Sequence, residues 1–197
     1  GCPYLCKFCV SGSQSGKVRH FPYDRLVAEI DYLRENAKHR FLRLSDDNFG
    51  IIEHDVELGA YIRKSYDEYN YPVGLKAYSA KRLSDRTRRL AMILKPLMLM
   101  CISLQTTTPE VLKKTKRTSA TETEALENLA FARKNGIATA TELIFGLPGE
   151  TLSSMKDVIN TTMEMRFDSI GINVLWLLIG ADLYRPEYRE QHGYRGK

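Results

Sequence analysis

Hydrophobic positions along the chain follow two alternating patterns. Residues 23–36 carry Leu26, Val27, Ile30 and Leu33 at the spacing of an amphipathic helix, whereas residues 98–104 form a nearly continuous apolar run, typical of a buried strand. The same reasoning predicts further helices over residues 55–69, 84–93 and 151–165, one starting at residues 108–110, one from Thr121 to 135–136, and strands over residues 41–44, 73–78, 137–145 and 170–178.

Five predicted strands separated by helices indicate an α/β fold with parallel strands and right-handed crossovers. In such sheets the reactive groups gather at the carboxyl ends of the strands. The segments at those ends are polar or glycine-rich, and they cover residues 45–48, 78–79, 105–108, 146–150 and 179–182. We expect residues 180–197, with scattered Tyr, Arg and Gly, to form a tail that leaves the core.

Several residues predict local structure. Thr108 is expected to cap the helix that Pro109 begins, and Thr121 with Glu124 predicts a capping box for the next helix. Cys101 is expected to be a buried thiol in the core. Core positions are also expected for the apolar stretch at residues 174–179, which includes Trp176, and for Met92, Met98, Met100, Met155, Met163 and Met165.

Size and composition fit one globular domain, or at most two small ones. The chain has 197 residues, of which 43% are hydrophobic and 27% charged, and this excludes collagen-like, disordered and coiled-coil classes. The sequence contains no apolar run long enough for a membrane span. The chain begins at Gly1 rather than at a methionine, so we expect a piece of a larger enzyme whose first strand is missing.

The formal net charge of +5 does not by itself indicate a nucleic-acid partner, because most basic residues lie beside acidic ones. The densest basic cluster is Lys113, Lys114, Lys116 and Arg117. It is open to three interpretations: a solvated helix face, a contact to an anionic substrate or RNA, or a cofactor contact made by one member.

Three of the four cysteines lie within eight positions, in the pattern Cys2-x-x-x-Cys6-x-x-Cys9. Thiolates are the ligands that iron–sulfur clusters require, and three of them leave one iron of a 4Fe–4S cluster open. Two alternatives remain: a zinc site with His20 as a fourth ligand, and structural or redox thiols. Thiols kept for metal binding predict a reducing, cytoplasmic location.

These residues resemble a known family. Residues 1–9, Gly-Cys-Pro-Tyr-Leu-Cys-Lys-Phe-Cys, are similar to the signature loop of the radical S-adenosylmethionine (SAM) superfamily. Residues 103–117 resemble its fourth strand and following helix, and residues 142–151 its fifth strand and loop. The resemblance implies a partial (β/α)6 barrel, similar to a TIM barrel, in residues 1–185, with residues 186–197 beginning a C-terminal extension or tail. It also implies that SAM binds the open iron and is cleaved to methionine and a 5′-deoxyadenosyl radical.

The resemblance assigns cofactor-binding roles to individual residues. Cys2, Cys6 and Cys9 would hold the cluster, and Phe8 would lie against the adenine. Gln105 and Glu142 resemble residues that face the ribose, and Arg117 resembles an arginine that binds the methionine carboxylate.

Two further segments complete the expected site. Where many members have Gly-Gly-Glu to bind the SAM amino group, this chain has Ser-Asp-Asp-Asn-Phe at residues 45–49, so Asp47, or second to it Asp46, is expected to take that role. Gly146 lets the backbone approach the cofactor closely. Ala77 stands where some members have an acid for the ribose, which leaves that contact without a side chain.

The predicted function is radical chemistry on an unreactive carbon, as methyl transfer or rearrangement. The Asp-Asp-Asn-Phe segment is similar to that of members whose core follows a cobalamin-binding domain, so cobalamin in an upstream domain is an expected additional cofactor. The expected partners are a small-molecule or peptide substrate and a reductant such as flavodoxin or ferredoxin, with no nucleic acid. The alternatives are a zinc- or cluster-containing RNA-binding module without catalysis and the core of an RNA methylthiotransferase.

Overall fold

The computed structural model describes residues 1–12, 17–117 and 122–195. They divide into two compact units, each built from several stretches of the chain. The first unit consists of Gly1–Arg19, Ser103–Glu124 and Ala140–Lys197, and the second of His20–Ile102 and Ala125–Thr139. None of the helices in the described ranges is long and apolar enough to cross a membrane.

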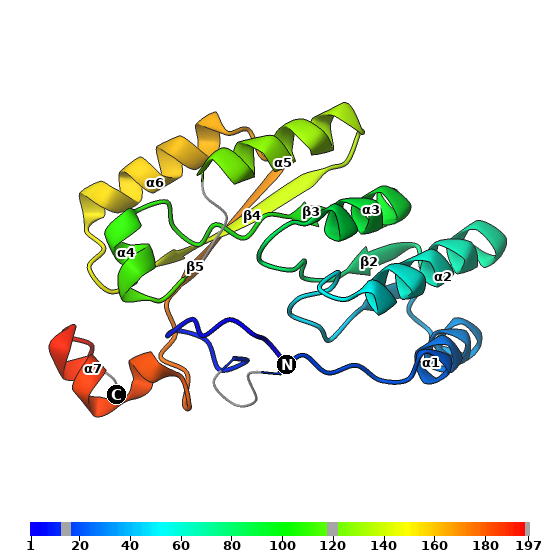
Figure 1. Ribbon diagram of the computed structural model, residues 1–197, viewed down its shortest axis with the longest axis horizontal. Helices are drawn as coiled ribbons and strands as arrows, with labels where there is room; N and C mark the ends of the chain where they lie inside the picture. The colour runs from blue at the N-terminus through cyan, green and yellow to red at the C-terminus, as the bar shows by residue number, and fades with distance from the viewer. Residues whose placement is uncertain (13–16, 118–121, 196–197) are drawn as a thin grey trace. The chain divides into compact units, whose positions relative to one another are not determined.

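The second unit holds a parallel pair of strands with helices packed against it. Its elements are α1 (Tyr23–Asn36), β1 (Phe41–Arg43), α2 (Glu53–Tyr69), β2 (Gly74–Lys76), α3 (Asp85–Leu94) and β3 (Met100–Cys101), with most of α5 (Glu122–Lys134). β1 pairs with β2 in the register Leu42↔Leu75, and α2 lies beside α3 (Figure 1). Gly59 permits this approach, since a Cβ there would come within 2.3 Å of a Leu90 methyl group.

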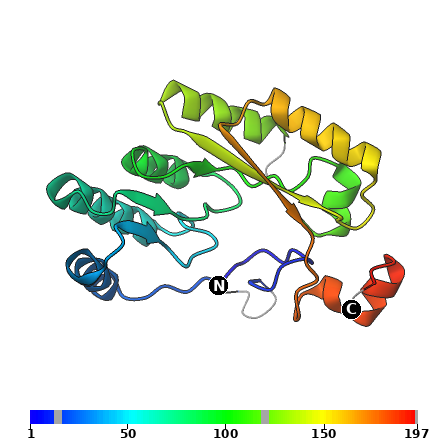
Figure 2. The ribbon, with the colours of Figure 1, turned by 180° about the vertical axis from the view of Figure 1, so that it is seen from behind.

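The first unit carries most of the predicted cofactor residues. It contains α4 (Pro109–Lys114), β4 (Thr139–Phe145) from Ala140 onward, α6 (Leu152–Glu164), β5 (Ser169–Val174), a 3-10 turn at Asp182–Tyr184, and α7 (Pro186–Gln191). β4 and β5 pair in parallel with Glu142 opposite Gly171, and α6 runs along this pair in both views (Figures 1 and 2).

Burial alternates along β4, as expected for a strand with one covered face. Thr141 and Leu143 are almost completely buried, while the alternate residues Glu142 and Ile144 are partly exposed. Gly171 pairs with Glu142 and Asn173 with Ile144 in the register of β5. The β4–β5 pair therefore has one packed face and one face that is partly open.

The predicted α/β class with parallel strands is confirmed, and each predicted helix and strand has a counterpart, although β2, β3 and β5 end earlier than predicted. Over the described residues the strands form two separate sheets, β1–β2 and β3–β4–β5, so the barrel is partial and not closed. β3 is much shorter than the predicted strand over residues 98–104. Its ladder stops because the backbone N–H of Leu104 donates to the Thr141 hydroxyl and Gln105 has a positive φ of 67°.

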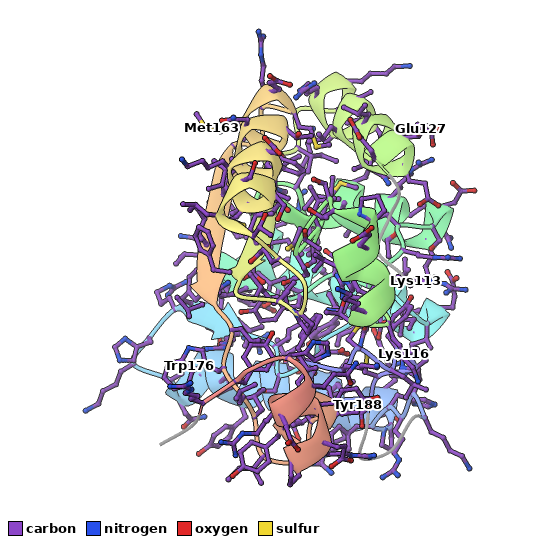
Figure 3. The ribbon with its side chains drawn as sticks, turned by 90° about the vertical axis from the view of Figure 1, so that its left-hand side faces the viewer. Lys113, Lys116, Glu127, Met163, Trp176 and Tyr188 are labelled. Carbon is purple, nitrogen blue, oxygen red and sulfur yellow. The ribbon has the colours of Figure 1, made fainter. Side chains whose placement is uncertain are left out.

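Some of the expected core residues are at the surface instead. Trp176 is 77% exposed and Met163 62%, and both lie at the periphery of the first unit (Figure 3). Met92, Val174, Leu178 and Ile179 are exposed as well, whereas Met100, Met155 and Met165 are buried as predicted. β5 stands last in the order β3–β4–β5, so residues 174–179 follow a strand with a neighbour on one side only.

Two other expectations also need correction. Residues 180–185 do not leave the core, because Ala181 and Leu183 are buried; that a C-terminal extension begins at residue 186 stays a prediction. Thr108 precedes α4, but its side chain makes no capping hydrogen bond, and its backbone N–H donates to the Thr106 hydroxyl instead. Thr121 lies outside the described residues. Cys101 is buried, as predicted.

Asp55 provides a test of what stabilises the second unit. Its carboxylate, within the first turn of α2, accepts from the backbone N–H of Gly50 at 2.8 Å and of Ile52 at 3.2 Å. Asp55→Ala should lower the free energy of unfolding by about 1–2 kcal/mol, because the N–H groups at the helix start lose their acceptor. Urea unfolding measures this loss. Asp67→Ala, which removes only an exposed ion pair with Arg63, is the control and should change stability by less than about 0.5 kcal/mol.

Candidate cofactor-binding site

The three clustered cysteines lie on a short loop that folds back on itself. Cys2 and Cys6 are buried, Cys9 is partly buried, and all three are free thiols. The backbone N–H of Cys9 donates to the Cys6 carbonyl at 3.0 Å, and the N–H of Ser11 points to the Cys9 sulfur at 3.4 Å. Gly12 closes the loop so tightly that a Cβ at this position would overlap the Tyr4 carbonyl oxygen.

Arg117 connects this loop to the segment that follows β3. One terminal nitrogen of its guanidinium lies 3.7 Å from the Cys6 sulfur, and the other donates to the Ser103 carbonyl at 2.6 Å. The side chain is 5% exposed, and its Nε is buried without a hydrogen-bond partner among the described residues. A guanidinium is always charged, so it places a fixed positive charge and one unused donor beside Cys6.

The cysteine loop is also held through its backbone. The N–H of Lys7 donates to the Thr115 carbonyl at 2.9 Å, just after α4 ends, and the Lys7 carbonyl accepts from Leu183 at 3.0 Å. The loop therefore contacts two segments that are far from it in the sequence, and both belong to the first unit.

Gln105 occupies a strained position next to β4. Its backbone N–H donates to the Glu142 carbonyl at 2.8 Å, and its carbonyl accepts from Ile144 at 2.9 Å. It is buried and has a φ of 67°, a conformation that costs a non-glycine residue roughly 1–2 kcal/mol. Such strain persists where the surroundings hold it in place, and it is common at ligand-binding sites.

Glu142 lies on the partly open face of β4, directly across from Gly171. A Cβ at Gly171 would lie 3.6 Å from the Glu142 Cγ, so the position directly opposite Glu142 on β5 carries no side chain. The backbones of Gln105 and Glu142 lie next to each other, and their ribose-facing roles stay predictions.

Gly146 is fixed on both sides of its backbone. It has a φ of 85°, its N–H donates to the Glu150 carboxylate at 2.6 Å, and its carbonyl accepts from the Tyr194 hydroxyl at 2.7 Å. Burial raises the pKa of Glu150 above its ordinary value, against the effect of the N–H donors of Gly146 and Leu147. Burial and the nearby Glu150 raise the pKa of Tyr194 to about 12.

Sequence reasoning missed Glu150, Tyr194 and Asn48. Glu150 lies in the strand-end segment 146–150, which the sequence predicts to be near the site. Tyr194 lies within residues 180–197, where no sequence pattern indicates a role for it. Asn48, after β1, is completely buried, and neither polar atom of its side chain has a partner in the described part of the chain. A buried amide without a partner is costly, so this position also deserves a functional explanation.

Two predicted residues are more accessible than Gln105 and Arg117. Phe8 is partly exposed on the cysteine loop, and Asp47 is exposed after β1 in the second unit. Beside it, Asp46 accepts from the backbone N–H of Asn48 at 2.7 Å. The cofactor roles of Phe8 and Asp47 stay predictions.

The cysteine loop fits an iron–sulfur cluster better than a single metal ion. Within the described ranges, no three His, Cys, Asp or Glu side chains converge on one point that could hold a metal ion. A 4Fe–4S cluster does not need convergence, because each thiolate binds a different iron. The N–H of Ser11 and the Arg117 guanidinium also supply the donors to sulfur that stabilise cluster thiolates.

Comparison with known proteins agrees with this geometry. The model of the Radical SAM superfamily matches residues 1–162. The chain is 32% identical over 206 residues to the cobalamin-dependent radical SAM methyltransferase TokK of Streptomyces tokunonensis, and 31% over 205 residues to the 2-(S-pantetheinyl)-carbapenam-3-carboxylate methyltransferase of Streptantibioticus cattleyicolor. Each match covers 99% of this chain but 29% of the relative, so the chain spans less than a third of these relatives.

The fold has a similar counterpart among solved structures. The radical SAM methyltransferase TsrM of Kitasatospora setae, solved with cobalamin and a [4Fe–4S] cluster bound, superposes with a TM-score of 0.77 at 23% identity. The superposition covers all of this chain and 37% of TsrM. At this identity the likeness supports the partial-barrel fold of the chain.

The cysteine loop predicts a clear result on reconstitution with iron and sulfide. Cys6→Ala should reduce the iron bound from about four atoms per chain to almost none, because one iron loses its thiolate. Iron analysis and the visible absorption of the cluster measure this. Cys101→Ala is the matched control, since Cys101 is a buried cysteine outside the loop, and it should retain the cluster. Full iron binding by Cys6→Ala would contradict the assignment.

Proposed function

This chain belongs to the radical SAM superfamily, and we propose that it forms the core of an enzyme that cleaves SAM reductively and uses the radical for methyl transfer to an unreactive carbon. The observation that carries the proposal is the Arg117 side chain, which joins Cys6 of the cluster loop to Ser103 and keeps one donor unused. The family uses a 4Fe–4S cluster and SAM. When bound, the cluster supplies the electron that splits SAM into methionine and a 5′-deoxyadenosyl radical.

The first group of residues holds the cluster and the methionine part of SAM. Cys2, Cys6 and Cys9 provide three thiolates and leave one iron for SAM. Arg117 presents its buried Nε–H, or part of its fork, to the methionine carboxylate, a pairing that planar guanidinium groups make well. Asp47 accepts from the SAM ammonium group.

A second group orients the nucleoside. Gln105, after β3, and Glu142, within β4, are joined by one backbone hydrogen bond and face the ribose hydroxyls. Gly146 brings backbone close to the nucleoside, and Phe8 covers the adenine. Because the strained backbone of Gln105 is fixed before ligand binds, little ordering would remain to be done on binding.

Methyl transfer is proposed rather than rearrangement because both relatives described above are named methyltransferases. TokK is described as cobalamin-dependent, and we propose that cobalamin takes part here as well, carried by a region outside these 197 residues. The substrate is a small molecule or peptide, and the electron donor is a flavodoxin or ferredoxin. Because thiols kept for a cluster need reducing conditions, we propose a reducing, cytoplasmic location.

Cleavage of SAM is the direct test. The reconstituted chain, reduced with dithionite without oxygen, should convert SAM to methionine and 5′-deoxyadenosine, because the radical takes a hydrogen atom. Liquid chromatography with mass detection measures both products. Cys6→Ala should form neither. If the native chain carries its cluster but produces no 5′-deoxyadenosine, the proposed function is wrong.

Arg117 allows a sharper test of cofactor binding. Arg117→Lys keeps the charge but loses the planar fork, so the affinity for SAM should fall roughly tenfold or more, as expected when a charge-assisted hydrogen bond is lost. Equilibrium binding of SAM to the cluster-loaded chain measures it. The control is Lys116→Arg, the reverse change at an exposed neighbour (Figure 3), which should bind SAM normally. Unchanged affinity in Arg117→Lys would remove the residue from the site.

A further inference from the structure

We infer that residues 180–195, here called the C-terminal clasp, are part of the cofactor site, and that Tyr194 is a positioning residue that fixes Gly146. The inference rests on the proposed function. The clasp contacts both the cysteine loop and the loop after β4, and all three segments belong to the first unit.

The contact of Tyr194 with Gly146 is specific. The Tyr194 hydroxyl donates to the Gly146 carbonyl at 2.7 Å, while the Gly146 N–H donates to Glu150 at 2.6 Å. Gly146 has a φ of 85°, in the region that glycine enters most freely. Without these two partners the backbone here could rotate easily, so the hydrogen bonds select one orientation of the loop that faces the cofactor.

The Tyr194 hydroxyl remains a donor over the working pH range. Its pKa of about 12, raised by burial and by Glu150, keeps the proton on the oxygen at neutral pH. Ionisation would turn the donor into an acceptor facing a carbonyl oxygen. The chemistry of the group thus agrees with the geometry.

The other end of the clasp holds the cysteine loop. Leu183 is buried and donates its backbone N–H to the Lys7 carbonyl at 3.0 Å. The Lys7 ammonium lies 4.4 Å from the centre of the Tyr188 ring, which projects from α7 (Figure 3). Lys7 lies between Cys6 and Cys9 in the sequence, so these contacts act directly on the loop that would hold the cluster.

A row of aromatic rings links the two ends of the clasp. The ring of His192 lies 6.4 Å from that of Tyr188 and 6.2 Å from that of Tyr194. Burial and the positive charges of Lys114 and Lys7 lower the pKa of His192, which keeps the middle ring uncharged at neutral pH. One short segment therefore ties the cluster loop to the loop after β4 and sets their spacing.

The test compares two changes that each remove one phenolic oxygen from the reconstituted 197-residue chain. Tyr194→Phe loses the hydrogen bond to Gly146, so the affinity for SAM should fall about three- to tenfold, the cost of one neutral hydrogen bond. Iron content should be unchanged, and excess SAM should restore the rate of 5′-deoxyadenosine formation. Tyr32→Phe, at an exposed tyrosine of α1 in the second unit, removes a phenolic oxygen outside the clasp and should bind SAM within about twofold of the native chain.

The outcomes separate the two proposals. A native affinity for SAM in Tyr194→Phe, with full iron content, overturns the positioning role and leaves the proposed function intact. A lower affinity together with lost iron means that Tyr194 supports only the fold, and this also overturns it. If the native chain itself binds iron but not SAM, the proposed function fails and the clasp inference fails with it.

Discussion

The site depends on one buried interaction, the guanidinium of Arg117 between the Cys6 sulfur and the Ser103 carbonyl. The cysteine loop begins the chain and Ser103 follows β3, so no local sequence contact could hold them together. A buried cation is expensive unless charge and hydrogen bonds compensate it. A Cys6 thiolate, which a cluster requires, would provide that negative charge. The arrangement that stabilises the buried Arg117 cation would therefore also stabilise the deprotonated, metal-binding form of Cys6.

Much of the architecture follows from local pattern. The helical spacing at residues 23–36 and the Asn135–Gly136 stop specify α1 and the end of α5, because these signals depend on nearby residues alone. Likewise, the cysteine spacing and the residues at strand ends identify most of the candidate site. The prediction that Trp176 lies in the core was wrong. Its hydrophobicity indicates only that burial would be favourable, whereas its burial depends on which segments pack beside β5, the last strand in the order β3–β4–β5.

The contacts that sequence could not reveal are long-range and made by single atoms. Tyr194 reaches Gly146 across forty-eight positions, and nothing in the mixed polar composition of residues 180–197 distinguishes it from Tyr184 or Tyr188. The same holds for Asn48, whose type suggests a turn and whose burial without partners only the fold discloses. The periodic spacing of hydrophobic residues can be recognised in a sequence. Hydrogen bonds between residues far apart in the chain become visible only in the tertiary structure.

Strain and unused hydrogen-bonding capacity occur in the same unit. Gln105 holds a left-handed backbone. Among the residues that the structure describes, the Nε of Arg117 has no acceptor and one buried oxygen of Glu150 has no donor. Each raises the free energy of the folded chain by itself. A ligand carboxylate could accept from the Arg117 Nε–H, and a ligand hydroxyl or amino group could donate to the Glu150 oxygen. SAM carries groups of both kinds. Under the proposed function, contacts of SAM with these groups would offset the free energy that they cost the fold.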